Sequence, residues 1–446
     1  MNATRLRTIL ALSVVFGVAG CATTYQMMPT PVLYTGAQAK PLFPDAPAVV
    51  RTPPLEVLYF TDRAPAQSPD PQAPYTAERS RAESFGTTTI LFGEGMTWDT
   101  LVKQSLMVDR SPSVDLTLGP TRELGRFPPI PYQYAETPAG LTRAPAVLKA
   151  DEAATRALQA EVARLLATSA RKEVVLYVHG VDNTFGDAAL TMGELCHFLG
   201  REFVCAIFTW PAAGTRGVLF GYEEDYESSL FAIEHLRKTI RAIAGTPGLK
   251  KIHLLAHSRG TDVVVTAVSE LSVEAYTQRS NLEQRYRIAN IVLLAPDLDP
   301  DVAVAKLFKV ASDPEVPYGT APNPSVVFEP MPGFHLTGYV SPGDKALATS
   351  GWLFGSLFRL GRLDRTMLTP DQLKHLRTLG MIDIIQVEGT SDFIGHSYFR
   401  SNPEASSDLI ALLRYGLRPN EPGRPLQEVQ KPFWRTLSGE KAVAAQ

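Results

Sequence analysis

The sequence predicts an α/β fold in which a mostly parallel sheet is covered by helices on both faces. From Val174 onward, short apolar runs alternate with longer segments whose apolar residues recur at helical spacing. The run 174–178 is almost purely apolar, which is typical of parallel strands that are buried on both faces. A third observation is the stretch Ile252–Ala256, which leads through Ser258 directly into a helical segment. This order predicts strands joined by right-handed helical crossovers.

The first part of the domain is expected to contain two strands and one long helix. Leu55–Phe60 and Phe85–Phe92 have the apolar and β-branched content of strands. Between them, residues 64–82 are rich in Pro, Ala and Ser and are predicted to form a loop. The Pro-rich segment 111–145 is expected to be irregular, whereas residues 149–170 place their apolar residues on one helical face.

Beyond this helix, strands and helices are expected to alternate to the end of the domain. Glycines follow several of the expected helices, in the position where a left-handed residue ends a helix. The expected strands are 174–178, 203–210, 252–256, 291–295, 336–340 and 382–387, and the expected helices are 188–199, 226–244, 263–271 and 403–415.

Composition and charge narrow the class of protein. With 446 residues, 45% hydrophobic and 20% charged, the chain can bury a large core like an ordinary globular protein. Its formal net charge of −3 gives no electrostatic reason to expect nucleic acid as a partner. No spacing of cysteines and histidines indicates a metal site, so we expect neither a metal nor another cofactor.

The N-terminus has the plan of a secretory signal. Arg5 and Arg7 precede the apolar run Ile9–Val18, and small residues follow it. The run is too short to cross about 30 Å of hydrocarbon as a permanent helix. We therefore expect residues 1–20 to be a signal peptide.

The residues around Cys21 refine this expectation. Val18-Ala19-Gly20-Cys21 is similar to the cleavage site of bacterial lipoproteins. The resemblance implies acyl chains on Cys21 and a membrane anchor, and Ala22 in place of Asp favours the outer membrane, with the protein facing the periplasm. A plain signal peptide with an incidental cysteine is the alternative.

Composition also suggests where the domain begins and ends. Residues 21–54 are rich in Pro, Thr and Ala without periodicity, so we expect a flexible tether there. The domain is expected over 55–420, and the polar residues 421–446 are expected to form a loosely held tail. Cys196 and Cys205 could pair in an oxidising periplasm, but two buried free thiols are the favoured interpretation.

The junction Ala256-His257-Ser258-Arg259-Gly260 is where chemistry is expected. A serine between small residues at a strand-to-helix corner sits on a strained turn that exposes its hydroxyl as a nucleophile. The first position is Ala instead of Gly, which weakens the match without breaking it. The alternative is an ordinary serine at the start of a helix.

A serine needs a base, and His396 is the favoured one of eight histidines. Reactive groups collect at the carboxyl ends of parallel strands, and His396 lies in the loop 388–402 directly after the last strand. The other histidines fall within helices or strands, at the wrong end of a strand, or, like His257, beside the serine but pointing away from it.

The acid that orients the base is left open among three aspartates. Asp344 follows the strand 336–340, while Asp297 and Asp299 follow the preceding strand. Each position keeps the chain order serine, acid, histidine. Asp344 is favoured, then Asp299 and Asp297, and the alternative role for each is to cap a helix or close a turn.

Two backbone amides are expected to bind the oxyanion. One is that of Arg259, directly after the serine, and the other is that of Val181. Val181 follows His179-Gly180, an HG pair directly after a strand, where Gly180 lets the chain turn toward the site.

These motifs together resemble a bacterial alpha/beta-hydrolase family of unknown function in the esterase/lipase superfamily. The similarity covers about residues 55–416 and includes Tyr59–Arg63, the HG segment, Phe208-Thr-Trp-Pro211, the serine corner, Leu294–Asp297, 341–347 and Gly395-His-Ser-Tyr-Phe399. It implies the hydrolase fold and the triad of serine, histidine and aspartate, but no particular substrate.

The sequence thus predicts a lipid-anchored serine hydrolase that acts through an acyl-serine intermediate. Esters are the favoured substrates, either small molecules or lipids, because their alkoxide leaves easily, and thioesters are a further alternative. An acyltransferase on the same fold and a catalytically silent envelope scaffold are the alternatives. Protein partners and the length of the acyl chain do not follow from the sequence.

Overall fold

A computed structural model describes residues 25–36, 39–68, 70–213, 217–313, 315, 335–353, 358–389 and 396–438. Residues 1–20 and Cys21 lie outside the described residues, so the signal and lipidation predictions stay predictions. Among the described residues, no helix combines the length and apolar character that a membrane span requires.

The described chain is organised around one twelve-stranded sheet with the order β1-β4-β3-β2-β8-β7-β9-β10-β11-β12-β14-β13. Strands β2, β8, β7, β9, β10, β11, β12 and β14 run parallel, and antiparallel pairs extend the sheet at both edges. The predicted α/β-hydrolase fold class is therefore confirmed. The strand bounds are β1 Tyr25–Gln26, β2 Leu55–Pro65, β3 Tyr75–Phe92, β4 Asp115–Arg126, β5 Tyr134–Thr137, β6 Gly140–Arg143, β7 Glu173–Val178, β8 Val204–Thr209, β9 Lys251–His257, β10 Ile288–Leu294, β11 His335–Val340, β12 Ile382–Gln386, β13 Leu426–Gln430 and β14 Phe433–Thr436.

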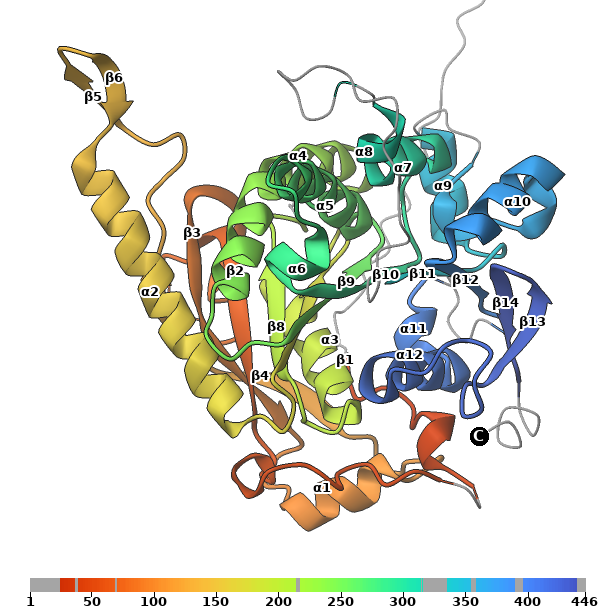
Figure 1. Cartoon of the computed structure of the whole chain (residues 1–446). Helices are drawn as coiled ribbons and strands as arrows, with labels where there is room; N and C mark the ends of the chain where they lie inside the picture. The colour runs from red at the N-terminus through yellow and green to blue at the C-terminus, as the bar shows by residue number, and fades with distance from the viewer. Residues whose placement is uncertain are drawn as a thin grey trace, which may run out of the picture.

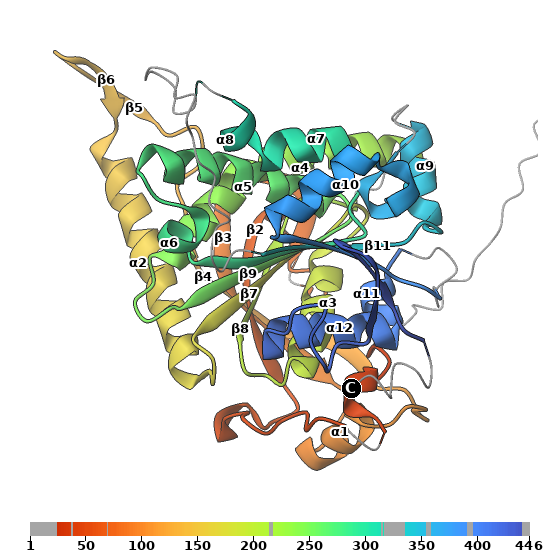
Figure 2. The same cartoon turned by 45° about the vertical axis from the view of Figure 1, so that its right-hand side comes forward.

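Helices cover both faces of this sheet, as Figures 1 and 2 show. Because strand side chains alternate between faces, Leu254 and Ala256 of β9 pack with the layer of α2, α4 and α5, whereas Leu255 packs with the layer of α3 and α12. The helix bounds are α1 Trp98–Ser105, α2 Pro145–Thr168, α3 Phe185–Phe198, α4 Gly217–Ala244, α5 Gly260–Thr277, α6 Leu282–Tyr286, α7 Pro300–Leu307, α8 Lys309–Ser312, α9 Lys345–Leu353, α10 Pro370–Leu379, α11 Tyr398–Ser401 and α12 Pro403–Tyr415.

The direction of the strand connections reverses at β7. The chain runs from β7 through α3 to β8 on one side, while β9 pairs with β7 on the other side. Connections that leave in opposite directions open a crevice at the carboxyl ends of the two strands, where ligands bind in open α/β sheets. The residues after β7 and after β9 therefore meet at this point.

The tether expected over 21–54 is wrong for its described residues. Tyr25 pairs with Leu116 of β4, and Met28, Leu33 and Tyr34 are almost fully buried against the domain. These apolar residues stand in runs of two or three between prolines and threonines, which are too short for periodicity to give a signal. Their burial depends on surfaces that distant parts of the chain supply.

Two loops expected near the N-terminus also contain strands. The prediction of a loop over 64–82 is wrong from Tyr75 onward, because β3 begins there and pairs with the end of β2. The irregular segment 111–145 is wrong for β4, which pairs with β3 over 116–126. Prolines on either side of β4 make the whole segment appear Pro-rich, although β4 itself contains threonines and leucines that favour a strand.

The tail expected over 421–446 is likewise wrong for its described part. β14 adds to β12 in parallel, and Phe433 and Trp434 are buried. The indole Nε1 of Trp434 donates to Asp383 Oδ1 at 2.8 Å, which fixes this strand to the sheet. The domain therefore extends past residue 420.

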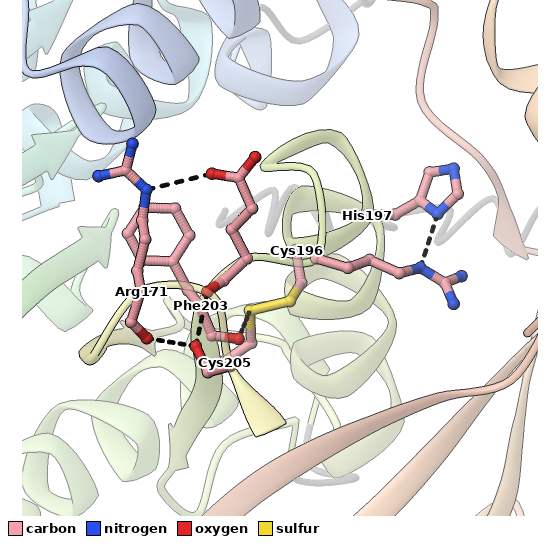
Figure 3. Close-up of a disulfide and its surroundings, with 8 residues drawn as sticks. Arg171, Cys196, His197, Phe203 and Cys205 are labelled. Atoms are coloured by element: carbon pink, nitrogen blue, oxygen red, sulfur yellow. Dashed lines mark hydrogen bonds and ion pairs between the residues drawn. A yellow bond between two sulfur atoms is a disulfide. The ribbon is translucent and has the colours of Figure 1, made fainter. Parts of the chain in front are cut away.

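Cys196 and Cys205 form a disulfide, so the interpretation as free thiols is wrong. Cys196 is on α3 and Cys205 is on β8, and their Cα atoms lie 6.1 Å apart (Figure 3). Both cysteines are buried. They are nine positions apart in the sequence, and the chain reverses direction between α3 and β8, which brings them within bonding distance. The bridge ties α3 to the strand on which it packs.

Candidate active site

Ser258 occupies a strained corner between β9 and α5. Its φ of +51° lies in the left-handed region that non-glycine residues avoid. Its amide donates to Leu294 O of β10 at 2.9 Å, and its carbonyl accepts from the Asp297 amide at 3.2 Å. Ser258 is buried in this corner. Backbone strain held by such bonds clusters at functional sites, which is consistent with a nucleophile corner.

Two glycines make this corner possible. A Cβ on Gly260 would lie 2.2 Å from the carbonyl oxygen of His179, so α5 could not start so close to the end of β7. A Cβ on Gly180 would lie 2.6 Å from Ser258 Cβ and 3.1 Å from Ser258 Oγ. The segment after β7 therefore passes directly against the serine hydroxyl.

The structure brings His396 and Asp344 together. His396 Nδ1 lies 2.7 Å from Asp344 Oδ2, and the Asp344 side chain is fully buried. Asp344 Oδ1 also accepts from the Leu347 amide at 3.0 Å, so the same carboxylate caps α9. With Nδ1 donating to the carboxylate, Nε2 of His396 is left as the nitrogen that can accept a proton.

The backbone of His396 is attached to the serine strand. His257, the residue before Ser258, donates from Nε2 to the carbonyl oxygen of His396 at 3.2 Å. The His257 and His396 rings lie 4.8 Å apart between centroids. Asp344, His396 and the corner of Ser258, which come from three distant segments, are thus linked in one cluster.

The two alternative acids have other tasks. Asp299 caps α7 by accepting from the amides of Asp301 and Val302. Asp297 is buried and accepts from the Ser350 hydroxyl at 2.6 Å, with the Arg359 guanidinium 3.3 Å away. Of the three aspartates, Asp344 is the one for which a contact with His396 is observed.

The amide of Val181 is aimed by its neighbouring peptide group. His179 Nδ1 donates to Gly180 O at 2.7 Å, while His179 Nε2 accepts from the Trp210 amide at 3.1 Å. In a trans peptide the N–H points opposite to the C=O. The Gly180 carbonyl is held by His179, so the Val181 N–H on the same peptide points the other way.

The amide of Arg259 is fixed in the same manner. The Ser258 carbonyl accepts from the amide and the hydroxyl of Thr261, at 3.1 Å and 2.6 Å. That carbonyl points into the first turn of α5, so the Arg259 N–H points out of the helix end. Two amides that are fixed before any substrate arrives are what stabilisation of an oxyanion requires.

Arg63 at the end of β2 supports this loop, and sequence reasoning noted it only as part of the family's start. Its buried guanidinium donates to Asn183 O at 2.5 Å, to Ala212 O at 3.1 Å and to Thr209 Oγ1 at 2.9 Å. Asp225 of α4 holds the residue before Asn183, accepting from the Asp182 amide at 2.9 Å. An arginine directly after a strand is too weak a signal to have assigned this role.

The protonation of His179 is set by these neighbours. Burial, and then the positive charge of Arg63, lower the pKa of His179 to about 3. Burial also lowers the pKa of Arg63 to about 10, so the guanidinium keeps its charge at neutral pH. A neutral His179 can donate from one nitrogen and accept at the other, as the two observed bonds require.

The other histidines are engaged away from the corner or exposed. His197 contacts Ser105 Oγ, His253 lies 2.9 Å from Glu173 Oε2, and His335 lies against Asp383. His235 is bonded to Asp62 at 3.0 Å, and His375 is exposed on α10. Within the described ranges, no group of three or more His, Cys, Asp or Glu could hold a metal ion.

Replacing Gly180 by Ala is expected to lower kcat/KM about 10²-fold for a reaction in which Ser258 takes part. The added methyl would press on Ser258, and a displacement of about 1 Å at a reacting group can cost that factor. Gly186→Ala is the matched control, because a Cβ there meets its nearest atom at an ordinary 3.5 Å. Unchanged kcat/KM in Gly180→Ala would show that this contact does not bear on the reaction.

A buried carboxylic acid on β3, Glu83, is expected to make stability depend on pH. Glu83 Oε1 accepts from the Thr239 hydroxyl, and Oε2 has no hydrogen-bond partner in the described part of the chain. Burial raises the pKa of Glu83 to about 7, although nearby His235 opposes the rise. The folded state therefore holds a proton that the unfolded chain has lost, and stability falls as pH rises from about 4.5 through about 7.

Glu83→Gln should remove this part of the pH dependence, which corresponds to about 3 kcal/mol. Chemical denaturation at pH 5 and pH 8 measures it as the difference between variant and wild type. Exposed Glu78 on the same strand provides the control Glu78→Gln. Equal pH dependence in Glu83→Gln and wild type would contradict the prediction.

A comparison with family models identifies the family of the chain. A family model described as "Alpha/beta hydrolase of unknown function (DUF900)" matches residues 154–414, more than half of the chain. An esterase structure from Pyrobaculum calidifontis matches with 13% identity and a TM-score of 0.28, covering 56% of this chain and 78% of the other. A predicted CIB-like hydrolase from Thermoplasma acidophilum matches with 12% identity and a TM-score of 0.27, covering 55% and 88%. Superpositions of that extent carry no argument about the site, and a search of curated proteins finds no match.

Proposed function

Because the chain belongs to the DUF900 family of alpha/beta hydrolases, we propose that it is a serine hydrolase that cleaves carboxylic esters. Ser258 is the nucleophile, His396 is the base and Asp344 holds the imidazole. The amides of Val181 and Arg259 bind the oxyanion. The observation that carries the proposal is the 2.7 Å contact of His396 Nδ1 with Asp344 Oδ2. The backbone carbonyl of the same histidine accepts a hydrogen bond from His257, the residue before Ser258.

In the first half of the reaction, Ser258 Oγ attacks the ester carbonyl as His396 Nε2 takes the hydroxyl proton. The carbonyl oxygen becomes an oxyanion that the two amides stabilise. His396 then returns the proton to the leaving alkoxide, so the alcohol departs and an acyl-serine remains. Asp344 stabilises the imidazolium throughout this step without taking the proton.

In the second half, water replaces the alcohol. His396 removes a proton from water as the oxygen attacks the acyl-serine carbonyl, and the same amides hold the new oxyanion. When this intermediate collapses, the carboxylic acid leaves and His396 returns the proton to Ser258 Oγ. No metal or cofactor enters any step.

Hydrolysis of nitrophenyl esters with acyl chains from acetate to laurate tests the proposal. We expect nitrophenolate release at a rate proportional to enzyme, together with one equivalent of free acid per turnover. A kcat/KM that rises with chain length would indicate a lipid-like acyl group, and a fall would indicate a small ester. No turnover of any ester or thioester would contradict the proposal.

We also propose that acyl chains on Cys21 hold the domain close to a membrane, in the envelope of a bacterial cell. The sequence around Cys21 supports this, and a buried disulfide is typical of oxidising compartments. Tyr25 is already packed, with its hydroxyl donating to Glu194 Oε1 at 2.9 Å. Four residues span at most about 14 Å, so an acylated Cys21 would keep Tyr25 within that distance of the bilayer surface.

Metabolic labelling with a radioactive fatty acid tests the anchor. Label should be incorporated into the wild-type chain and be lost in Cys21→Ser. Fractionation should then move the protein from the membrane to the soluble fraction. Equal labelling of both chains, or a soluble wild type, would contradict lipidation without affecting the proposal on ester hydrolysis.

A further inference from the structure

The position of the proposed base depends on more than its carboxylate. His396 is followed by α11, which the ion pair of Arg400 with Glu194 fastens to α3. Tyr398 of the same helix donates its hydroxyl to Tyr339 O at 2.8 Å. These bonds hold the chain after His396, whereas the backbone of His396 itself is held by a bond from the serine strand.

That bond comes from His257, the residue directly before Ser258. Side chains alternate along β9, so His257 lies on the same face as Leu255. Helices α11 and α12 belong to the layer on that face of the sheet. There its Nε2 donates to His396 O at 3.2 Å, and its ring lies 5.0 Å from that of Phe399. A carbonyl can only accept, so the proton of neutral His257 is on Nε2.

We propose that His257 is a positioning residue, which sets the distance between the His396 imidazole and the Ser258 hydroxyl through the His396 carbonyl. His257 and Ser258 are adjacent at the end of β9. A hydrogen bond from His257 to His396 therefore fixes the position of His396 relative to the nucleophile. His257 contacts neither the substrate nor the transferred proton. The inference rests on the proposed serine-hydrolase function.

The surroundings of His257 suit a fixed hydrogen-bond donor rather than a second base. Its side chain is buried, and burial followed by the proximity of His396 lowers its pKa well below the usual value. It therefore stays neutral across the physiological range and keeps the same tautomer while His396 gains and loses a proton. A neutral neighbour also spares the imidazolium of His396 a like charge 4.8 Å away.

Two substitutions separate the bond from the bulk of the ring. His257→Gln keeps an N–H close to the position of Nε2, whereas His257→Leu fills similar space without a donor. We expect kcat to fall 10- to 100-fold in His257→Leu with KM within about twofold, because a small displacement of a catalytic group acts on the reaction more than on binding. His257→Gln should stay within about threefold of the wild type.

His253 supplies the matched control. It is a buried histidine of the same strand and the same face, bonded to Glu173 at 2.9 Å and to Asn290 at 2.8 Å, at the opposite end of β9. His253→Leu should lower the melting temperature and leave kcat near the wild-type value. If His257→Leu keeps full kcat, or if both His257 variants lose kcat equally, the proposal is wrong.

Nuclear magnetic resonance of ¹⁵N-histidine-labelled protein tests the bond without turnover. His257 should show the Nε2–H tautomer from pH 5 to pH 8, with its proton protected from exchange. The Nδ1–H tautomer or a freely exchanging ring would overturn the inference. This result distinguishes a failure of the positioning role from a failure of the serine mechanism, which absence of all ester turnover would reveal.

Discussion

Ser258→Ala is expected to lower kcat for ester hydrolysis by about 10⁴-fold or more. The variant lacks the oxygen that forms the acyl intermediate, while the oxyanion amides and the binding surface remain. Alanine has the same preferred backbone conformations as serine, so the strained φ of +51° costs the variant no more than the wild type. The loss should therefore appear in kcat at an unchanged melting temperature, measured by initial rates and thermal unfolding.

A second buried serine, on the helix that follows Ser258, distinguishes chemistry from packing. Ser269 lies on α5, the helix that Ser258 precedes, and it is also buried. Ser269→Ala should keep kcat within about twofold of the wild type. A Ser258→Ala protein that retains more than about a hundredth of the wild-type rate would require another nucleophile.

Asp344→Asn is expected to lower kcat by about 10³- to 10⁴-fold. An amide nitrogen in place of Oδ2 would donate to Nδ1 of His396, so the ring would carry its proton on Nε2 and could not accept one from the serine. Asparagine is as good a helix cap as aspartate, so the bond from Leu347 and the start of α9 should survive. The result is a folded protein with a wrong tautomer.

Asp299→Asn is the control for this substitution. Asp299 caps α7 as Asp344 caps α9, so both variants keep a cap, but of the two Asp344 is the one for which a contact with His396 is observed. Activity should be unchanged in Asp299→Asn. If that variant lost turnover while Asp344→Asn did not, the assignment of the acid would be wrong.

These two aspartates show how far sequence reasoning reaches. Parallel strands put their carboxyl ends on one edge, so a histidine and an aspartate that follow strands could be placed near Ser258 from the sequence. Both aspartates also precede helices. The sequence could not distinguish an aspartate that only caps a helix from one that caps a helix and also contacts His396 with its second oxygen. That distinction depends on how β11 lies in the sheet relative to β12, which is a tertiary property.

Other features were beyond reach for similar reasons. The disulfide needs the turn between α3 and β8 to bring Cys196 and Cys205 together, and spacing alone does not fix that turn. Met28 and Leu33 are buried only because distant elements supply the surface that covers them. Arg63 orders the loop after β7 through bonds to backbone carbonyls, which no residue pattern records.

Reaction with a fluorophosphonate, followed by mass analysis of the peptide that contains residue 258, tests the central claim most directly. Fluorophosphonates phosphonylate a serine only when a base and an oxyanion site activate it, so the mass should increase on Ser258 of the wild type, with stoichiometry approaching one. The rate should fall at least 10²-fold in His396→Ala, and Ser258→Ala should remain unmodified. A wild-type protein that stays unmodified at Ser258, or is modified at the same rate without His396, would contradict the serine-hydrolase mechanism.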